Sequence, residues 1–339
     1  MSKKTTFAVI ADLHVDIMHD AEERLKSFLA AARAADVDFI IQLGDFCYPD
    51  EGRRCVCAPE KRPENIEAAL KFPTYADKES IHALYLGFEK PSYHVIGNHD
   101  CDMCSKRQVL DYYQADYEPY YSFDCGAFHF IALDPNYYKK DGKYVSYECG
   151  NYFDEAYHAV SVLPYLPHEQ LVWLKKDLDS TDLPSVIFTH QCLKEGEAGA
   201  ILNANEFKEA IKGRRSRVVA CFSGHSHIDY AVRDNGVWYM HINSASSFWM
   251  GNEYTCLGRY GSEIDEKYPS IRYVAPYSKP LYAIIELDER GASIKGTNGE
   301  FVGKSPDELG WYKVNGYDKV SSAEIGVKPR IEDRYLPFE

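Results

Sequence analysis

The sequence predicts an α/β protein with parallel strands, and three observations lead to this fold class. Residues 5–11 and 37–43 are β-rich apolar runs, and residues 21–35 between them are helix-forming. That helix has one apolar face, made by Leu25, Phe28, Leu29 and Ala32. A strand, a helix and a strand at this spacing form a βαβ unit with parallel strands. Several strand candidates also end on Asp, Asn or His, where open α/β sheets place ligand chemistry.

The later part of the chain continues the alternation of helices and strands. Helices are expected over 76–88, 105–114, 167–178 and 206–212. Strands are expected over 93–96, 120–124, 127–134, 185–189, 217–222, 237–242, 281–287 and 292–295. The turn Asp124-Cys125-Gly126 joins two of these strands as a hairpin, which makes the sheet mixed.

Chain length favours one large domain with insertions over two domains. The 339 residues are 45% hydrophobic, enough to fill a single α/β core. We expect this domain to span residues 1–300, with loop insertions near 46–75, 135–165 and 250–279. The insertion at 135–165 is rich in Tyr, Gly and Asn and is expected to be a loop over a site. Residues 301–339 are expected to form a C-terminal extension packed on the core.

Charge and hydropathy limit the partners. The net charge is 38 − 52 = −14, which disfavours attraction to nucleic acid or to an anionic membrane but leaves an anionic small substrate open. No stretch approaches the roughly 18 consecutive apolar residues of a membrane span. The N-terminus leaves no room for a signal peptide, so a cytoplasmic location is expected. Ten cysteines in that setting are expected to be reduced thiols.

The turn Gly97-Asn98-His99-Asp100 follows the strand expected at 93–96 and offers three kinds of chemistry. Asn98 has a neutral carbonyl oxygen for a hard cation, and His99 can transfer protons near neutral pH. Asp100 can orient that imidazole. Gly and Asn also begin ordinary turns, so this motif indicates a functional site only in combination with the other motifs of the chain.

Five strand ends carry potential metal ligands. They are Asp12 and His14, Asp45, Asn98 and His99, His190, and His225 with His227. Imidazoles and carboxylates are ligands for manganese, iron and zinc. Any single one of the twelve histidines is more simply a polar loop residue. Two carboxylates about 4 Å apart, however, repel by ~4 kcal/mol at an effective dielectric of about 20, and a cation removes this cost.

The ordered set DLH, GD, GNHD, a strand-ending His and GHSH resembles the calcineurin-like metallophosphoesterase superfamily, over residues 12–227. The resemblance implies a four-layer α/β/β/α sandwich of two mixed sheets flanked by helices. It also implies two divalent or mixed-valence ions, of manganese, iron or zinc, at one edge. By the family's pattern Asp12, His14 and His227 hold the first metal, Asn98, His190 and His225 hold the second, and Asp45 bridges them.

The activity implied by the resemblance is hydrolysis of a phosphate mono- or diester, with a nucleotide or cyclic nucleotide as candidate substrate. Two cations about 3.5 to 4 Å apart bind the ester and a hydroxide that attacks in line. His99 then protonates the leaving oxygen, with Asp100 as its orienting partner.

Two features of the motifs leave the metal site open to other interpretations. Gly44-Asp45-Phe46-Cys47-Tyr48 resembles the GDxxY motif of purple acid phosphatases, whose Tyr binds ferric iron, but those enzymes lack the His found here as His14. We favour His14 as the ligand and Tyr48 as a pocket wall. Cys101 and Cys104 form a CxxC, for which incidental thiols rank ahead of a redox or zinc role.

Three alternative functions are compatible with parts of this pattern. The aromatic-rich segments 135–165 and 250–279 could stack a base, which would suit a nucleotide pyrophosphatase. A non-catalytic metal-binding module of the same fold is disfavoured because every expected position is kept. A protein phosphatase would carry phosphate-gripping arginines beside the GD and GNHD motifs, whereas Cys101 and Asp102 follow Asp100 here and the next arginine is Arg107.

Overall fold

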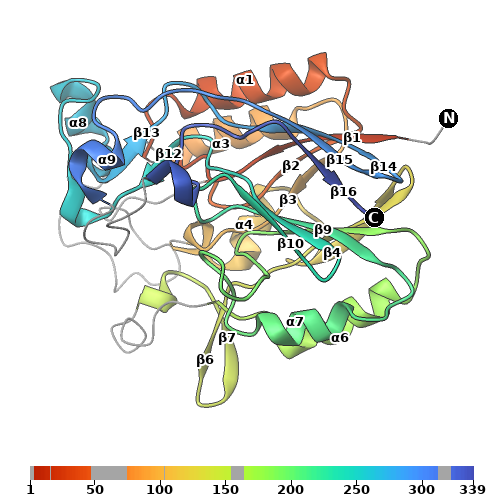
Figure 1. The fold of residues 1–339 in the computed structure, drawn as a ribbon. Coiled ribbons are helices and arrows are strands. Elements are labelled where there is room, and N and C mark those ends of the chain that lie inside the picture. The colour runs from red at the N-terminus through yellow and green to blue at the C-terminus, as the bar shows by residue number, and fades with distance from the viewer. Residues whose placement is uncertain (1–3, 16, 47–74, 103, 154–163, 312–321) are drawn as a thin grey trace.

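The computed structural model describes residues 4–15, 17–46, 75–102, 104–153, 164–311 and 322–339. Tyr48 and nearly all of the insertion expected at 46–75 therefore lie outside the described residues. In the part that is described, two six-stranded mixed sheets face each other between layers of helices (Figure 1).

The first sheet has the order β16-β15-β14-β1-β2-β3. Its strands are β1 (Thr5–Ile10), β2 (Phe39–Gln42), β3 (Ser92–His94), β14 (Ala283–Asp288), β15 (Gly291–Gly296) and β16 (Arg334–Pro337). β1, β2 and β3 run parallel, which confirms the predicted βαβ unit, and β14, β15 and β16 add to it antiparallel. The C-terminal segment thus contributes an edge strand to this sheet.

The second sheet has the order β10-β11-β9-β8-β5-β4. Its strands are β4 (Tyr121–Cys125), β5 (Phe128–Ala132), β8 (Ser185–Thr189), β9 (Val218–Ser223), β10 (Tyr230–Asp234) and β11 (Val237–His241). The four central strands are parallel, and β4 and β10 close the two edges as antiparallel hairpin partners.

Aromatic side chains fill the space between the sheets. Phe7 and Phe39 of the first sheet pack against Phe130 and Phe188 of the second, with ring centroids 5.0 to 6.5 Å apart. These rings are fully buried or nearly so, and a buried aromatic contributes about 1.5 to 3 kcal/mol by the removal of its apolar surface from water. This apolar layer is the main contact between the two sheets.

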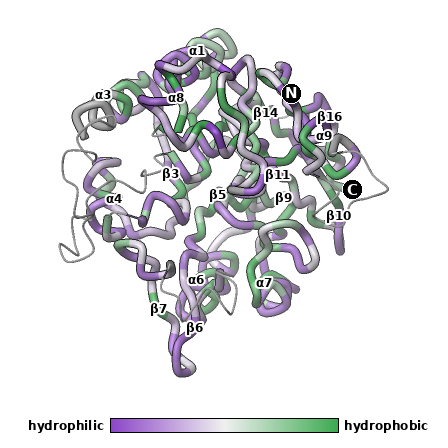
Figure 2. The backbone as a smooth tube through the Cα atoms, turned by 90° about the vertical axis from the view of Figure 1, so that its left-hand side faces the viewer, coloured by the Kyte–Doolittle hydropathy of each residue, from purple (hydrophilic) through white to green (hydrophobic). Residues whose placement is uncertain are grey.

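Helices cover the outer faces of both sheets. The helices are α1 (Ala21–Ala34), α3 (Tyr75–Leu86), α4 (Lys106–Tyr112), α6 (His168–Leu178), α7 (Ala204–Ile211), α8 (Ser262–Lys267) and α9 (Pro306–Leu309). The apolar face of α1 packs on the outer side of β1, and α6 and α7 pack on the outer side of the second sheet. Figure 2 shows the resulting order of layers, with α1 and α3 above β3, β5, β9 and β11, and with α6 and α7 below. The four-layer α/β/β/α architecture is confirmed.

The expected loops contain more regular structure than predicted. Residues 135–165 include a hairpin of β6 (Tyr137–Lys140) and β7 (Lys143–Ser146), which turns at Asp141-Gly142 with both residues at positive φ. Residues 250–279 include α8 and β13 (Val274–Pro276), which pairs with β12 (Ser247–Trp249). A DG pair is a readable hairpin signal, and the prediction missed it. Among the described residues no helix has both the length and the apolar content needed to cross a membrane.

Candidate metal centre

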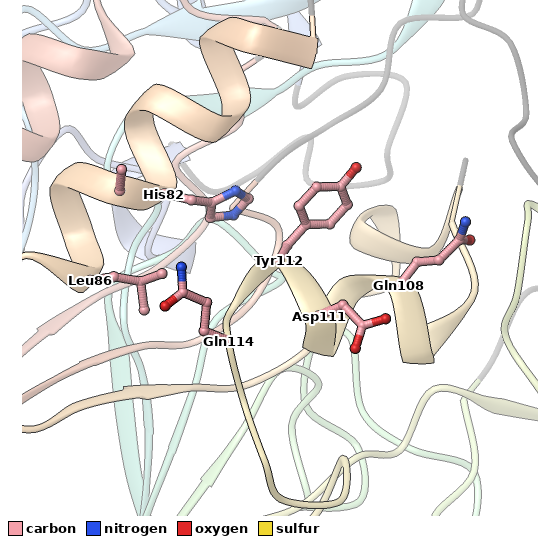
Figure 3. A pocket seen from close by; sticks show the side chains of 7 residues that line it. His82, Leu86, Gln108, Asp111, Tyr112 and Gln114 are labelled. Carbon is pink, nitrogen blue, oxygen red and sulfur yellow. The ribbon is translucent and has the colours of Figure 1, made fainter.

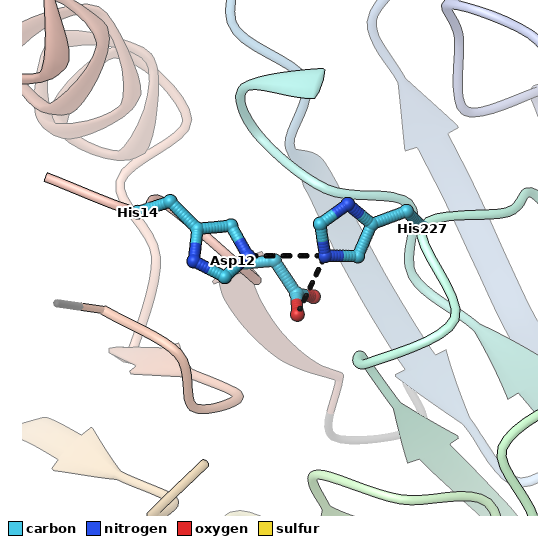
Figure 4. Close-up of side chains that lie close together, drawn as sticks. All are labelled: Asp12, His14 and His227. Carbon is cyan, nitrogen blue, oxygen red and sulfur yellow. Dashed lines mark hydrogen bonds and ion pairs between the residues drawn. The ribbon is translucent and has the colours of Figure 1, made fainter. Parts of the chain in front are cut away.

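The first ligand cluster joins the ends of β1 and β9. Asp12 and His14 follow β1, and His227 lies in the turn after β9. Nε2 of His227 lies 3.1 Å from Nε2 of His14 and 3.3 Å from Oδ1 of Asp12, so the three side chains converge on one point (Figure 4). All three residues are buried, and their ligand atoms lie within 4.8 Å of one another.

The donor chemistry of this cluster fits a cation. Nδ1 of His227 is 2.7 Å from the carbonyl oxygen of Ser247, and a carbonyl can only accept, so Nδ1 carries the proton and Nε2 presents a lone pair. Burial, together with the nearby His227 imidazole, lowers the pKa of His14 well below its usual value, which keeps this ring neutral. Two imidazoles and a carboxylate facing one another are the usual ligands of a first-row divalent metal.

The second cluster repeats this arrangement at the ends of β2, β3, β8 and β9. Nε2 of His190 lies 3.1 Å from Oδ2 of Asp45 and 3.1 Å from Oδ1 of Asn98. Nδ1 of His190 is 2.7 Å from the Leu43 carbonyl oxygen, which again turns the Nε2 lone pair toward the other ligands. His225 completes the group within 4.8 Å, and burial beside His190 lowers its pKa to about 3. This cluster also fits a cation.

Asp45 lies between the two clusters. Its carbonyl oxygen accepts a hydrogen bond from the backbone N–H of His14 at 3.1 Å, while its carboxylate faces His190. Burial raises the pKa of the Asp45 carboxyl, but the imidazoles of His190 and His99 outweigh burial and hold that pKa well below its usual range. Burial lowers the pKa of His190, yet Asp45 raises it to about 9. A cation would compete with the proton that His190 Nε2 shares with Asp45 Oδ2, because it would bind these same two atoms.

Backbone strain is concentrated in these ligands. Ten non-glycine residues of the described chain have positive φ, and five of them are Asp12, His14, Asp45, His225 and His227. Side chains with a Cβ adopt this region at a cost of about 1 to 3 kcal/mol, and such strain gathers at functional sites. The expected ligands are therefore held in place by the surrounding fold.

Gly97 permits the close approach of Asp45. A Cβ on Gly97 would lie 2.1 Å from both the backbone nitrogen and Oδ1 of Asp45. The glycine of the GNHD motif is thus required by packing against the carboxylate that separates the two clusters.

His99 lies beside the metal ligands without belonging to either cluster. Its backbone N–H donates to Oδ1 of Asp45 at 2.8 Å, and its ring centroid is 6.1 Å from that of His14. Burial lowers the pKa of His99, but the carboxylates of Asp102 and Asp45 raise it above the ordinary value overall. The imidazole is about a quarter exposed, with a relative side-chain exposure of 24%.

The carboxylate that faces the His99 ring belongs to Asp102, which corrects the role expected of Asp100. Nδ1 of His99 lies 2.9 Å from Oδ2 of Asp102, one turn further along the short helix η2 (His99–Cys101). Oδ2 of Asp100 instead accepts the backbone N–H groups of Gly97 at 2.8 Å and Asp45 at 3.0 Å. Because Asp100 is needed to close the turn, it cannot also point this oxygen at the imidazole.

Tyr152 is a further residue at this site that sequence reasoning missed. Its hydroxyl donates a short hydrogen bond to Oδ1 of Asp102 and lies 3.3 Å from Nδ1 of His99. Tyr152 is buried in η3 (Asn151–Phe153), fifty positions from Asp102 in the chain. The Tyr-rich composition of 135–165 gave the one available signal, and it did not single out this tyrosine.

The cysteines take no part in the candidate metal groups of the described residues. Cys101 is buried, and burial raises the pKa of its thiol well above the usual value, so it is a poor metal ligand. Cys149 is disulfide-bonded, so the expectation of reduced thiols is wrong at this position. Disulfides are typical of oxidising compartments, so the cysteines no longer support the expected cytoplasmic location.

A separate cavity of about 540 Å³ lies between α3 and α4 (Figure 3). Its labelled lining residues are His82, Leu86, Gln108, Asp111, Tyr112 and Gln114. None of the candidate metal ligands lines it, so we assign no substrate to this cavity.

Comparison with known proteins agrees with this geometry. The sequence profile of the calcineurin-like phosphoesterases matches residues 5–229, which include every ligand of both clusters. This chain belongs to the calcineurin-like phosphoesterase family. A search of curated protein sequences found no match to this chain.

Solved structures share the fold of this family member at low sequence identity. A dimetal phosphatase from Danio rerio is 17% identical, with a TM-score of 0.57 over 89% of this chain and 99% of its own. GAP50 of Plasmodium, described as the anchor in the inner membrane complex, is 15% identical, with a TM-score of 0.49 over 95% of this chain and 98% of its own. The similarity to the Danio rerio structure supports the fold assignment.

Proposed function

We propose that this chain is a dinuclear-metal-dependent hydrolase of phosphate mono- or diesters. The observation that carries the proposal is the pair of adjacent ligand clusters with a partly exposed imidazole beside them. Asp12, His14 and His227 would hold one ion, Asn98, His190 and His225 the other, and Asp45 would be shared. When bound, such ions act as Lewis acids toward phosphate oxygens and make water nucleophilic near neutral pH.

The protein's own residues supply positioning and proton transfer. Nδ1–H bonds from His190 and His227 to backbone carbonyls fix the direction of both Nε2 atoms before any ion binds. His99 is placed by its backbone N–H on Asp45, and its ring is not used as a ligand in either cluster. We assign His99 as the proton donor to the leaving oxygen.

The substrate class is a small phosphorylated molecule, with a nucleotide or cyclic nucleotide as first candidate. Support comes from Trp249, which is 38% exposed at the end of β12. Ser247 of the same strand accepts the hydrogen bond of His227, so an aromatic surface lies a short distance from the first cluster. Aromatic faces stack on bases, and the same surface would suit a nucleotide-linked diphosphate. A pyrophosphatase is therefore the alternative activity.

The test is metal analysis followed by a substrate panel. The purified protein is loaded with manganese, iron or zinc and assayed against phosphate monoesters, diesters and pyrophosphates, with and without a nucleoside group. Two ions per chain and turnover of a mono- or diester are expected. Turnover restricted to pyrophosphates would favour the alternative. Tight binding of phosphate esters with no hydrolysis under any metal would contradict the enzyme assignment and indicate a binding module.

A further inference from the structure

We propose that Asp102 and Tyr152 act together as positioning residues for the His99 imidazole. This inference rests on the proposed function, because positioning matters for turnover only if His99 donates a proton. The starting observation is that Nδ1 of His99 faces two buried oxygens, Oδ2 of Asp102 at 2.9 Å and the Tyr152 hydroxyl at 3.3 Å.

Both oxygens of the Asp102 carboxylate are engaged. Oδ2 faces Nδ1 of His99, and Oδ1 accepts the short hydrogen bond from the Tyr152 hydroxyl. A carboxylate held at both oxygens cannot rotate without breaking a buried hydrogen bond. Tyr152 therefore fixes Asp102, and Asp102 fixes the ring.

This arrangement selects one tautomer of His99. A carboxylate oxygen only accepts, so the proton shared with Asp102 resides on Nδ1. Nδ1 faces the buried groups Asp102 and Tyr152, and 24% of the side chain is exposed, so we infer that the opposite edge of the ring, which carries Nε2, is the one open to a substrate. The imidazolium form of His99 carries a proton on each ring nitrogen, so it gives the Nε2 proton to the leaving oxygen of a bound ester and keeps the Nδ1 proton that faces Asp102.

Tyr152 is itself held in place by contacts with neighbouring residues. Its ring stacks on Tyr147 at 4.4 Å with an interplanar angle of 12°. The backbone N–H of Gly150 donates to the Cys101 carbonyl at 3.0 Å, which joins the segment before η3 directly to η2. The segment 135–165, which we expected to cover the site, is thus hydrogen-bonded to the short helix that carries His99.

The activity test uses three variants and two esters of different leaving-group quality. Asp102→Asn and Tyr152→Phe remove the two contacts. Tyr147→Phe is the matched control, because its hydroxyl has no hydrogen-bond partner in the described part of the chain and only the ring stacks on Tyr152. Phenyl phosphate needs protonation of its leaving oxygen, whereas 4-nitrophenyl phosphate needs little.

We expect kcat on phenyl phosphate to fall on the order of 10- to 100-fold in Asp102→Asn and about 3- to 10-fold in Tyr152→Phe. Losses on 4-nitrophenyl phosphate should be smaller, and Tyr147→Phe should match the wild type. KM and metal content should stay unchanged in Asp102→Asn, which is the decisive variant, because the Tyr152 hydroxyl also bonds the side chain of the metal ligand Asn98. In a His99→Ala background Tyr152→Phe should add no further loss, since it acts through His99. A further loss there, or equal losses on both esters, would overturn the positioning role and leave the proposed function intact.

A second measurement does not depend on turnover. NMR of protein labelled with ¹⁵N-histidine, with the His99 signals assigned by His99→Ala, reports which ring nitrogen carries the proton. We expect a protonated Nδ1 in the wild type and in Tyr147→Phe. In Asp102→Asn the amide favours the other tautomer, so the proton should move to Nε2. An unchanged spectrum in Asp102→Asn would overturn the proposal even if the wild type hydrolyses no ester, an outcome that would separately contradict the proposed function.

Discussion

Single residues at the centre of this molecule hold positions that most side chains would not adopt. Asp45 has a positive φ, a carboxylate against His190 and a carbonyl against the His14 backbone. Its neighbour across the turn must be glycine, because a Cβ on Gly97 would overlap its backbone nitrogen and Oδ1. The strain at Asp45 is maintained by contacts from three strand ends, and a substitution there affects both clusters.

Asp45→Ala is expected to abolish activity and to lower metal content from two ions per chain to one or none. The reason is that Asp45 belongs to the second ligand group, its backbone carbonyl contacts His14 of the first, and we propose its carboxylate as the shared ligand. Metal analysis and turnover on the best ester measure the two effects. Asp38→Ala serves as a control, since that carboxylate accepts the backbone N–H of Thr6 at the other end of β1. Two ions and normal turnover in Asp45→Ala would contradict the shared role.

His99→Ala is expected to keep two metals and to lose on the order of 100- to 10,000-fold in turnover of esters with poor leaving groups. The ring belongs to neither ligand cluster, so metal binding should survive. An activated ester such as 4-nitrophenyl phosphate should lose less. Equal losses on both esters would indicate that His99 positions the phosphate rather than the proton.

At the scale of elements, polar contacts attach helices and loops to the sheets. Arg24 of α1 is only 2% exposed and donates to the carbonyls of Ala245 at 3.0 Å and Tyr277 at 2.6 Å. It also pairs with Asp20 at 2.7 Å. One guanidinium thereby joins α1 to the segment between β11 and β14.

Arg24→Ala should destabilise the fold by about 3 to 5 kcal/mol, because it leaves the buried carbonyls of Ala245 and Tyr277 without their hydrogen-bond donor and Asp20 without its partner. Thermal or denaturant unfolding measures the change. Lys26→Ala on the same helix is the control. Its ion pair with Glu22 is about half exposed, and exposed pairs contribute little. Similar losses in both variants would contradict the anchoring role of Arg24.

A second element-scale contact is sensitive to pH. His129 of β5 lies between Asp124 of β4 at 2.6 Å and Asp177 of α6 at 2.8 Å. Burial lowers its pKa, but the two carboxylates outweigh burial and raise it. A raised folded-state pKa stabilises the protein below the unfolded value of about 6.5, and this stability is lost as the pH rises through the folded-state pKa.

His129→Gln should therefore lower the free energy of unfolding more at pH 5.5 than at pH 9. The loss at pH 5.5 should be about 1 to 3 kcal/mol, as for hydrogen bonds between charged groups. Metal-free protein is used at both pH values so that metal release does not contribute. A larger loss at pH 9 would show that the sign is wrong.

For the whole molecule, the two candidate ligand clusters form a second contact between the two sheets. Asp12, His14, Asp45 and Asn98 follow strands of the first sheet, whereas His190, His225 and His227 follow strands of the second. Each cluster takes ligands from both sheets. Ions bound there would join the sheets at the edge of the aromatic core.

Metal removal is therefore expected to lower Tm by several degrees. Binding to the folded state alone stabilises by about 2.7 kcal/mol at one hundred times Kd. Calorimetry with and without chelator measures the shift, and Asp45→Ala should show little or none. A wild-type Tm that is unchanged by chelation and by added metal would contradict a link between the sheets.

Local sequence patterns predicted the parallel βαβ unit, the positions of most strands along the chain and the seven candidate ligands. These follow from local pattern, since apolar runs define strands and the turn at each strand end lies next to its strand in the chain. The hairpin at Asp141-Gly142 was also readable, because a DG turn is a local signal.

The carboxylate that faces His99 could not be predicted from the sequence. Asp100 is adjacent to His99 in the chain and Asp102 is three positions away, yet the more distant carboxylate faces the ring, because the backbone N–H groups of Gly97 and Asp45 donate to Asp100. The pairing of Tyr152 with Asp102 spans fifty positions, and that of β16 with β15 depends on edge hydrogen bonds. Such contacts depend on packing between segments that are distant in the chain, so the spacing of residues along the sequence does not predict them.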